Sequence, residues 1–451
     1  MAELLGWTRE ALGRAHLVQV AWSLHRELAL GLDALGALRI PTDLLTEFPH
    51  WRRGSTAGFS PRSLGLAPVP EAAGQPLRTI RLQVAPSTGA TSILLTLLAD
   101  LRRRLDPAAG IVVLVDPDAD IAGLRRLARL STAGGRRVRW ATVDFPTIFA
   151  RDNAVAARDA RGRPVLLVPR ALRTEWESAA EPLDVRAAER RLGLRVARSR
   201  LHWHGGNIQF DGECLAVGAD AIAENVTRLG LAPHEVVALL VAELGRDVVV
   251  LGDPTEARFD HVTNRVAPSA QASYHIDLDV MLLGRVGRAR RPTALLADPR
   301  QGLASVHDVV ADRRLAAVPH LSAPHARQEL TREYHLAARQ REPALHEYRK
   351  RLVGLGYRVV DVPDLRTRGV SDGPFGSGDL DFIYCNVLPG LNRGRAAVHY
   401  LPWGVPSLDQ AAARSMRAAD VRPIRVSITP YLARAMMQRA AGLRCFCGTM
   451  P

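Results

Sequence analysis

The segment Ser273–Val280 holds the residues of this sequence most suggestive of chemistry, with the order Ser-Tyr-His-Ile-Asp-Leu-Asp-Val. Its alternation of apolar and polar side chains predicts a β-strand. On such a strand His275, Asp277 and Asp279 would share one face, opposite the apolar residues. A histidine and two carboxylates are costly to bury unless they are solvated, paired or used in catalysis. The alternative is an exposed sheet face that carries incidental charges.

A second segment, Phe149–Asn153, places Asp152 and Asn153 after a predicted strand. Taken alone, this Asp-Asn pair is best explained as turn chemistry, because both side chains bond to nearby backbone and tolerate unusual dihedral angles.

A third segment, His202–Gly212, contains the run Gly205-Gly206-Asn207, where the backbone could approach a ligand closely. The alternative is a tight turn that leads into a hairpin. His202 and His204 are spaced to share a strand face. No third ligand accompanies them at a suitable spacing, so we predict no metal site.

The C-terminal run Gly442–Pro451 contains Cys445 and Cys447. A Cys-x-Cys pair could form half of a metal site, but Cys214 and Cys385 are isolated and supply no second pair. The other chemical interpretation is a nucleophilic thiol, which needs a nearby cation or histidine to become a thiolate. A frayed tail is the alternative, although two cysteines and a phenylalanine beside a glycine favour a function.

Apolar periodicity predicts the elements that must position these residues. Strands and helices alternate along the chain, and a hairpin is expected at Asn153–Val168, around the turn Asp159–Gly162. The helix near 94–105 should bury one leucine face. The pattern divides the chain into a helical N-terminal region at 1–50, a Gly/Pro/Ser-rich linker at 51–76 and one α/β domain at 77–451.

Composition and charge narrow the classes of function. The 451 residues are 47% hydrophobic and 24% charged, as expected for a globular protein. Net charge is +14, but Lys350 is the only lysine and the arginines are scattered, so no nucleic-acid partner is expected. Four cysteines suit a reducing compartment, and there is neither a signal-peptide pattern nor a membrane-length apolar run. We therefore expect a cytoplasmic protein without a membrane partner, although export without a classical signal stays open.

In this order the four segments resemble the guanidino-group-modifying (pentein) superfamily, which includes arginine, agmatine and peptidylarginine deiminases. Phe149–Asp152 resembles its aromatic-x-x-Asp segment, and His204–Asn207 its Gly-Gly-Ser/Asn-Ile segment. His275-Ile276-Asp277 matches its His-hydrophobic-Asp core. Cys447-Gly448-Thr449-Met450-Pro451 resembles both the Cys-Gly-Thr and the Cys-x-Ser/Thr-Met-Pro sequences of its members, and this double match selects Cys447 over Cys445. Leu295–Arg300 and Cys385–Leu388 add weaker similarity.

The resemblance implies a five-bladed α/β propeller of ββαβ-type units. It also implies a cysteine hydrolase that converts a guanidino group to a ureido group and ammonia through a covalent thiouronium, a route that needs neither a metal nor an organic cofactor. In that mechanism Cys447 is the nucleophile, His275 is the general acid and base, and Asp152 and Asp277 hold the guanidinium. Expected substrate contacts are Phe149, Gly205, Gly206, Asn207 and Asp279. His204 stands where deiminases of small substrates have Glu, and Asp279 is a candidate substitute carboxylate.

Several alternatives remain open from the sequence. An amidinotransferase would use the same Cys, His and Asp set, with an amine rather than water resolving the intermediate. A catalytically inactive pentein or a basic binding protein is a further alternative. The substrate could be arginine, agmatine, or arginine within a peptide or protein. Residues 1–76 could mediate self-association into a homo-oligomer, cover the site or recruit a protein target.

Overall fold

The structure of this chain, a computed structural model, describes the residues given at the end of this paragraph. Within them the chain forms five sheets of three or four strands and two of two strands, connected by helices. This confirms the predicted mixed α/β class. The N-terminal region predicted to be helical, 1–50, and residues 51–63 of the predicted linker lie outside the described part. The described residues are 64–84, 90–117, 119, 121–127, 138–145, 147–173, 179–180, 183–254, 259–260, 265–266, 271–287, 289–311, 324–367, 381–427 and 441–451.

One sheet joins the two ends of the described chain. Its strand order is β22-β2-β3-β4, with β22 antiparallel to β2 and the other pairs parallel. The intervening helices are amphipathic, and the predicted leucine face of α3 is buried from Leu94 to Leu105. The elements are β2 (Thr79–Val84), α3 (Ala90–Arg104), β3 (Gly110–Val115), α4 (Ile121–Leu127), β4 (Val138–Thr142) and β22 (Gly448–Met450).

The next sheet, in the order β1-β5-β6-β9, contains the predicted hairpin. The turn between β5 and β6 is closed by Asp159, whose Oδ1 accepts from the amides of Arg161 and Arg163. β1, which lies within the predicted linker 51–76, pairs with β5, and Leu66 and Ala73 are buried. The elements are β1 (Leu66–Pro68), β5 (Val155–Asp159), β6 (Pro164–Val168), α5 (Val185–Leu192) and β9 (Arg195–Arg198).

The remaining three larger sheets repeat one pattern, an antiparallel pair followed by a helical crossover to a parallel strand. The first has β10 (Ile208–Phe210), β11 (Leu215–Gly218), α6 (Ala219–Leu229), α7 (Pro233–Leu244) and β12 (Val248–Leu251). The second has β15 (Val280–Arg285), β16 (Pro292–Asp298), α8 (Pro299–Leu303), α9 (Val306–Ala311), α11 (Pro324–Gly354), β17 (Arg358–Leu365) and β18 (Phe382–Ile383). The third has β19 (Leu388–Asn392), β20 (Arg395–Tyr400), α12 (Pro406–Ala418) and β21 (Arg422–Arg425).

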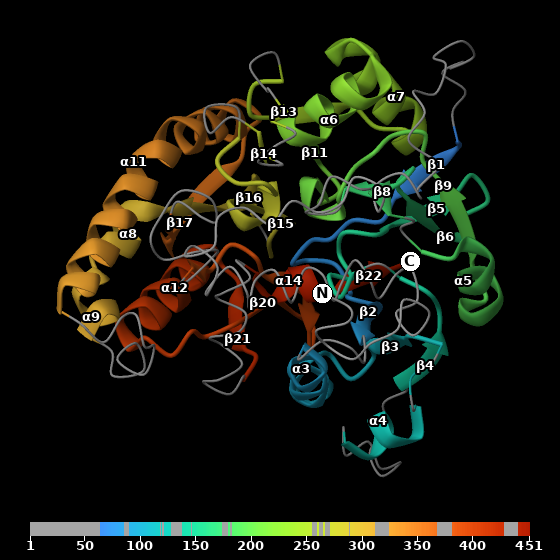
Figure 1. Cartoon of the computed structure of the whole chain (residues 1–451), viewed down its shortest axis with the longest axis horizontal. Coiled ribbons are helices and arrows are strands. Elements are labelled where there is room, and N and C mark those ends of the chain that lie inside the picture. The colour runs from blue at the N-terminus through green and yellow to red at the C-terminus, as the bar shows by residue number, and fades with distance from the viewer. Residues whose placement is uncertain are drawn as a thin grey trace, which may run out of the picture.

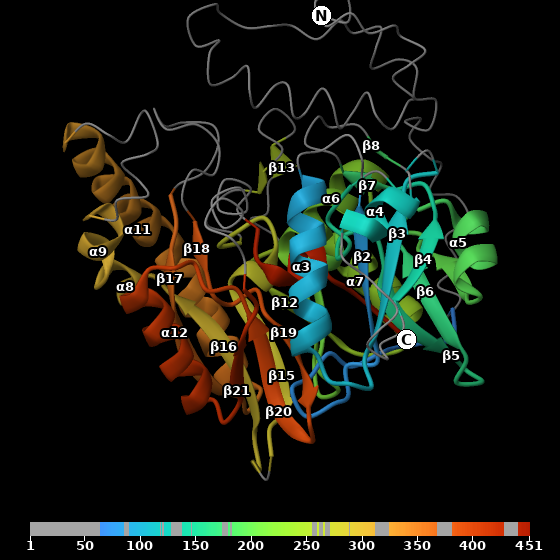
Figure 2. The same ribbon diagram turned by 90° about the horizontal axis from the view of Figure 1, so that it is seen from below.

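The longer helices lie around the outside of the molecule, whereas the C-terminal segment with the short helix α14 (Leu443–Phe446) lies near its middle (Figure 1). Figure 2 shows α11 and α12 on one side and α5 on the opposite side, with α3 between them. Helix α14 leads into β22. Two small ribbons complete the fold, β7 (Leu172–Arg173) with β8 (Ala179–Ala180) and β13 (Phe259–Asp260) with β14 (Arg265–Val266). Among the described helices, none has the length and apolarity needed to cross a membrane.

Candidate active site

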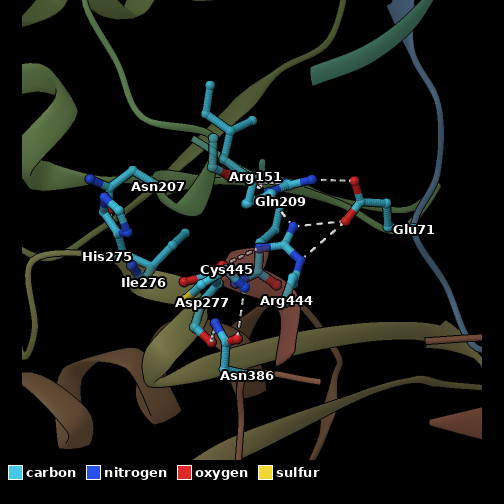
Figure 3. A network of polar contacts seen from close by, with 12 residues as sticks. Glu71, Arg151, Asn207, Gln209, His275, Ile276, Asp277, Asn386, Arg444 and Cys445 are labelled. Atoms are coloured by element: carbon cyan, nitrogen blue, oxygen red, sulfur yellow. Dashed lines mark hydrogen bonds and ion pairs between the residues drawn. The ribbon is translucent and has the colours of Figure 1, made fainter. Parts of the chain in front are cut away.

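Four segments that are distant in the sequence meet in the middle of the molecule. The Arg151 amide donates to the Cys445 carbonyl at 3.2 Å, and the Gly205 amide donates to the Asp152 carbonyl at 3.1 Å. The 3-10 turn η3 (Gly205–Asn207) contacts a second 3-10 turn, η4 (Ile276–Leu278). Figure 3 shows the side chains that these segments bring together. The motifs singled out in the sequence therefore surround one buried region.

The segment Ser273–Val280 does not form the predicted strand. The Asp279 amide donates to the Ile276 carbonyl at 3.0 Å, which closes η4, and β15 begins only at Val280. In a 3-10 turn residues two apart do not share a face, because the turn repeats every three residues. Asp277 and Asp279 consequently point to different surroundings, and Tyr274, expected in the core, is 40% exposed.

The Asn207 side chain forms hydrogen bonds with the backbone on both sides of His275. Its Oδ1 accepts from the Ile276 amide at 3.1 Å, and its Nδ2 donates to the Tyr274 carbonyl at 3.0 Å. Oδ1 also accepts from Gln271 Nε2 at 3.1 Å. Both sides of the Asn207 amide are therefore used to hold the loop that carries the imidazole.

Gly205 and Gly206 provide the close backbone approach that their sequence predicts, and its partners are protein groups. A Cβ at Gly206 would lie 2.5 Å from His275 Nδ1, and one at Gly205 would lie 2.0 Å from the Arg151 carbonyl oxygen. Real Cβ contacts are longer than this, so only glycine lets the chain pass against the imidazole at this point.

A buried charge network underlies the site, and sequence reasoning missed most of it. Arg444 donates from Nη1 to Asp277 Oδ2 at 2.6 Å and from Nη2 to Glu71 Oε2 at 2.8 Å, while Arg151 pairs with the other oxygen of Glu71. Thr449 donates to that oxygen as well, at 2.5 Å. Burial acts to raise the pKa of Glu71, but the two guanidinium groups outweigh it and lower that pKa to about 2.

Glu71 lies in the predicted linker, which is why it was missed. The signals available in the sequence were Arg151 next to Asp152 and Arg444 next to Cys445, two arginines within apolar surroundings.

Asp277 keeps one oxygen available beside this network. Oδ2 is paired with Arg444, whereas Oδ1 is buried and has no hydrogen-bond partner. Burial raises the pKa of Asp277 to about 6, although Arg444 and Arg151 act in the opposite direction. A buried carboxylate oxygen without a donor is unfavourable, so this atom marks a position where a ligand donor would be stabilised.

Asp152 lies between two imidazoles. Its Oδ1 is 3.7 Å from His275 Nδ1, and its Oδ2 is 3.8 Å from His204 Nδ1. Burial acts to raise the pKa of Asp152, but His275, His204 and the Gly206 amide outweigh it, so the pKa lies below its usual value. Donor atoms of these three side chains all lie within 4.8 Å of one another. The fold thus supplies the third metal-ligand position that the sequence spacing lacked.

Cys445, rather than Cys447, lies beside the carboxylates. Burial raises the pKa of the Cys445 thiol well above its usual value, Asp277 and Asp152 raise it further, and Arg444 opposes them. The Cys445 amide donates to Asn386 Oδ1 at 3.1 Å. For Cys447 burial alone raises the pKa. The two carboxylates therefore act on the thiol of Cys445, whereas the likeness of sequence selected Cys447.

Asp279 is separated from this group. It accepts from Arg341 Nη2 at 2.6 Å and from Ser273 Oγ at 2.9 Å, and its Oδ1 lies 3.2 Å from Arg366 Nη2. The structure thus places Asp279 in a second ion-pair cluster and does not bring it together with Asp152. Phe149, also expected at the substrate, packs on Phe446 with ring centroids 5.3 Å apart.

Several solved structures share the fold of this chain. A candidate peptidyl-arginine deiminase has a TM-score of 0.55 at 14% identity, covering 86% of this chain and 98% of its own. The agmatine deiminase of C. jejuni has a TM-score of 0.52 at 12% identity, covering 85% and 95%. A candidate agmatine deiminase has a TM-score of 0.56 at 13% identity, covering 86% and 96%.

No protein-family model and no curated protein matches the chain. The chain has the fold of these deiminases, which confirms the predicted resemblance to the guanidino-modifying proteins at the level of fold.

Proposed function

We propose that this chain is a cysteine hydrolase that converts a guanidino group to a ureido group and ammonia, with Cys445 as its nucleophile. Asp152 and Asp277 hold the guanidinium, and His275 is the general acid and base. Arginine, agmatine and peptidyl-arginine are the candidate substrates. The fold shared with deiminases supports the reaction class, and the charges around Cys445 support the choice of thiol.

The main support for this proposal is Asp277 Oδ1, which is buried and has no hydrogen-bond partner. Asp277 and a second carboxylate, Asp152, both act on the thiol of Cys445. A guanidinium is planar and permanently charged and carries paired N–H donors in a fork. Carboxylates on two sides accept such donors and hold the plane of the group. The cation would then satisfy Asp277 Oδ1 and bring its central carbon to Cys445.

Substrate binding would itself activate the thiol. In the free protein burial raises the pKa of Cys445, and Asp277 and Asp152 raise it further because a thiolate would be a third negative charge there. A bound guanidinium cancels that charge and thereby lowers the thiol pKa. The thiol gives its proton to His275, and the resulting thiolate sulfur forms a bond to the guanidinium carbon, whose C–N double-bond electron pair moves to nitrogen.

His275 moves the protons of the two following steps. The carbon–nitrogen bond breaks, the nitrogen takes its electron pair and a proton from His275, and ammonia leaves behind a covalent thiouronium. The neutral imidazole then takes a proton from water, whose oxygen attacks the same carbon. The carbon–sulfur bond breaks as the added oxygen loses its remaining proton to solvent, which releases the ureido product and the Cys445 thiolate.

The test compares two cysteines only two residues apart. The full chain is incubated with arginine, agmatine and an arginine-containing peptide, and both ammonia and ureido product are measured. Cys445→Ala is expected to abolish turnover, whereas Cys447→Ala should retain most of it. Loss in Cys447→Ala with full activity in Cys445→Ala would reject the assignment of the nucleophile.

Two further measurements bear on the class of reaction. A haloacetamidine reagent, which resembles a guanidinium, should alkylate Cys445 faster than iodoacetamide does, as read by peptide mass spectrometry. Absence of both turnover and preferential labelling would reject a working deiminase site. Product formed only with an added amine acceptor, without ammonia, would instead establish an amidinotransferase.

We also propose that the five larger sheets are the blades of a propeller. Four contain an antiparallel pair followed by a crossover to a parallel strand, and in the fifth β22 supplies the antiparallel partner of β2 from the C-terminal end. An experimental structure with the five sheets arranged around one axis would bear this out.

A further inference from the structure

Three side chains with metal-binding donors meet on one side of the candidate active site. Asp152 lies between His204 and His275, and one of its oxygens approaches each ring, at 3.8 and 3.7 Å respectively. The two imidazole centroids are 5.1 Å apart, and the rings are tilted by 53°. Two imidazoles and one carboxylate form the mixed nitrogen and oxygen set that binds Zn²⁺ and neighbouring divalent transition metals.

His204 is the side chain whose environment points to a ligand. Its Nδ1 and Nε2 are both buried, and neither makes a hydrogen bond. Asp152 Oδ2 lies 3.8 Å from Nδ1, which is too long for a hydrogen bond. Buried polar atoms are normally paired, so an unsatisfied imidazole beside a carboxylate indicates a missing partner between them.

The spacing of the donors is close to that of a metal site. Ligands bound tetrahedrally to Zn²⁺ at about 2.0–2.1 Å are separated from one another by about 3.3 Å. The two measured separations exceed this by a few tenths of an ångström, which rotations of the side chains can remove. All the donor atoms already lie within 4.8 Å of one another.

We propose that Asp152, His204 and His275 bind one divalent transition-metal ion and that this ion excludes the guanidino substrate. The ion would take the Asp152 oxygens and an imidazole nitrogen of His275, the groups that hold the guanidinium and transfer its protons. Metal and substrate are both cations that need the same carboxylate, so they cannot occupy the site together. Binding of the ion stands on the geometry alone, whereas its inhibitory effect rests on the proposed function.

The binding test uses the full-length Cys445→Ala chain, in which the neighbouring thiol cannot supply a ligand. It is titrated with CoCl₂, followed by the visible absorption of bound cobalt, and with ZnCl₂ by calorimetry. We expect one ion per chain, and at least a tenfold loss of affinity when His204→Gln or Asp152→Asn is added. His234→Gln, at an exposed histidine, is the matched control and should bind as before. Absence of binding, or binding that survives His204→Gln, would overturn the proposal.

The inhibition test uses the chain with native Cys445 and whichever guanidino compound it turns over. ZnCl₂ should raise the apparent KM without lowering kcat at saturating substrate, and a chelator should restore the original KM. Inhibition that lowers kcat alone would overturn the exclusion of substrate by metal. Cobalt binding without turnover of any guanidino compound would leave the metal site standing and reject the proposed function, and turnover without cobalt binding would do the reverse.

Discussion

Arg444 and Asp277 form an ion pair in which both side chains are fully buried, with Nη1 2.6 Å from Oδ2. One edge of the Asp277 carboxylate is thereby fixed by a guanidinium of the protein itself. The other oxygen remains without a donor beside Cys445. The pair thus orients the carboxylate that we propose holds the guanidinium of the substrate.

Removal of the charge on Glu71 should destabilise the fold strongly. Glu71→Gln leaves Arg151 and Arg444 buried without their shared anion, and loss of one member of a buried network costs about 3–5 kcal/mol. Urea unfolding followed by circular dichroism measures the change. The control is Glu213→Gln, whose partner Arg285 is largely exposed, and it should alter stability little. Equal losses of stability in the two variants would show that the buried network contributes no more to stability than an exposed ion pair does.

Gly206→Ala should disable the site without unfolding the protein. The added methyl would lie 2.5 Å from His275 Nδ1 and would displace the ring, and a misplacement of about 1 Å in a catalytic group can cost roughly 100-fold in rate. The measurement is kcat on the substrate identified above. Gly354→Ala is the control, because a Cβ there meets no atom within 4 Å. Normal kcat in Gly206→Ala would show that the close approach to His275 is unimportant.

Asn207→Ala should lower kcat more than it lowers stability. The substitution removes the hydrogen bonds of Asn207 to the Ile276 amide and the Tyr274 carbonyl. Their loss should destabilise the loop that carries His275 by about 1–3 kcal/mol. A decrease in kcat of roughly tenfold or more is expected. Asn392→Ala removes a buried asparagine that binds the Arg104 carbonyl elsewhere, and it should affect unfolding but not kcat. A similar kcat for both variants would contradict the positioning role.

Guanidinium binding should weaken as the pH falls below about 6. Burial raises the pKa of Asp277 to about 6, so the carboxylate becomes neutral below that pH and no longer attracts the cation. Asp152 has a lowered pKa and stays ionised in this range. The affinity for the guanidinium should therefore follow the titration of a single group, Asp277. Calorimetry of agmatine binding to Cys445→Ala, from neutral to mildly acidic pH, isolates this effect from catalysis. Affinity independent of pH over that interval would contradict it.

Turnover of small cationic substrates should increase modestly with ionic strength. The chain carries a net charge of +14, which repels a guanidinium at long range, and salt screens this repulsion over a Debye length of about 10 Å at 0.1 M. The measurement is kcat/KM at low and at physiological ionic strength. Agmatine, with two positive charges, should respond more than arginine, which has one net charge. A decrease with salt would instead indicate steering by the acidic site.

Local periodicity in the sequence was sufficient to predict many of the elements. The leucine face of α3 and the β5–β6 hairpin both follow from apolar spacing and turn residues. These features depend on contacts between residues close in the chain, for which side-chain spacing is a direct signal. The sequence also marked Asp152 and the His275–Asp277 segment, which the fold brings to one site.

Only the tertiary structure decided which of these groups face one another. Glu71 pairs with Arg151 and Arg444. Neither ion pair produces a periodic pattern in the sequence, because the partners are far apart along the chain. Cys445 and Cys447 are chemically identical in sequence, and the turn of α14 into β22 decides which of them lies beside Asp277. The partners of Asp279, Arg341 and Ser273, likewise come from outside its own turn. The direction of a side chain in a short 3-10 turn is set by hydrogen bonds from distant segments, as Asn207 shows at Ile276.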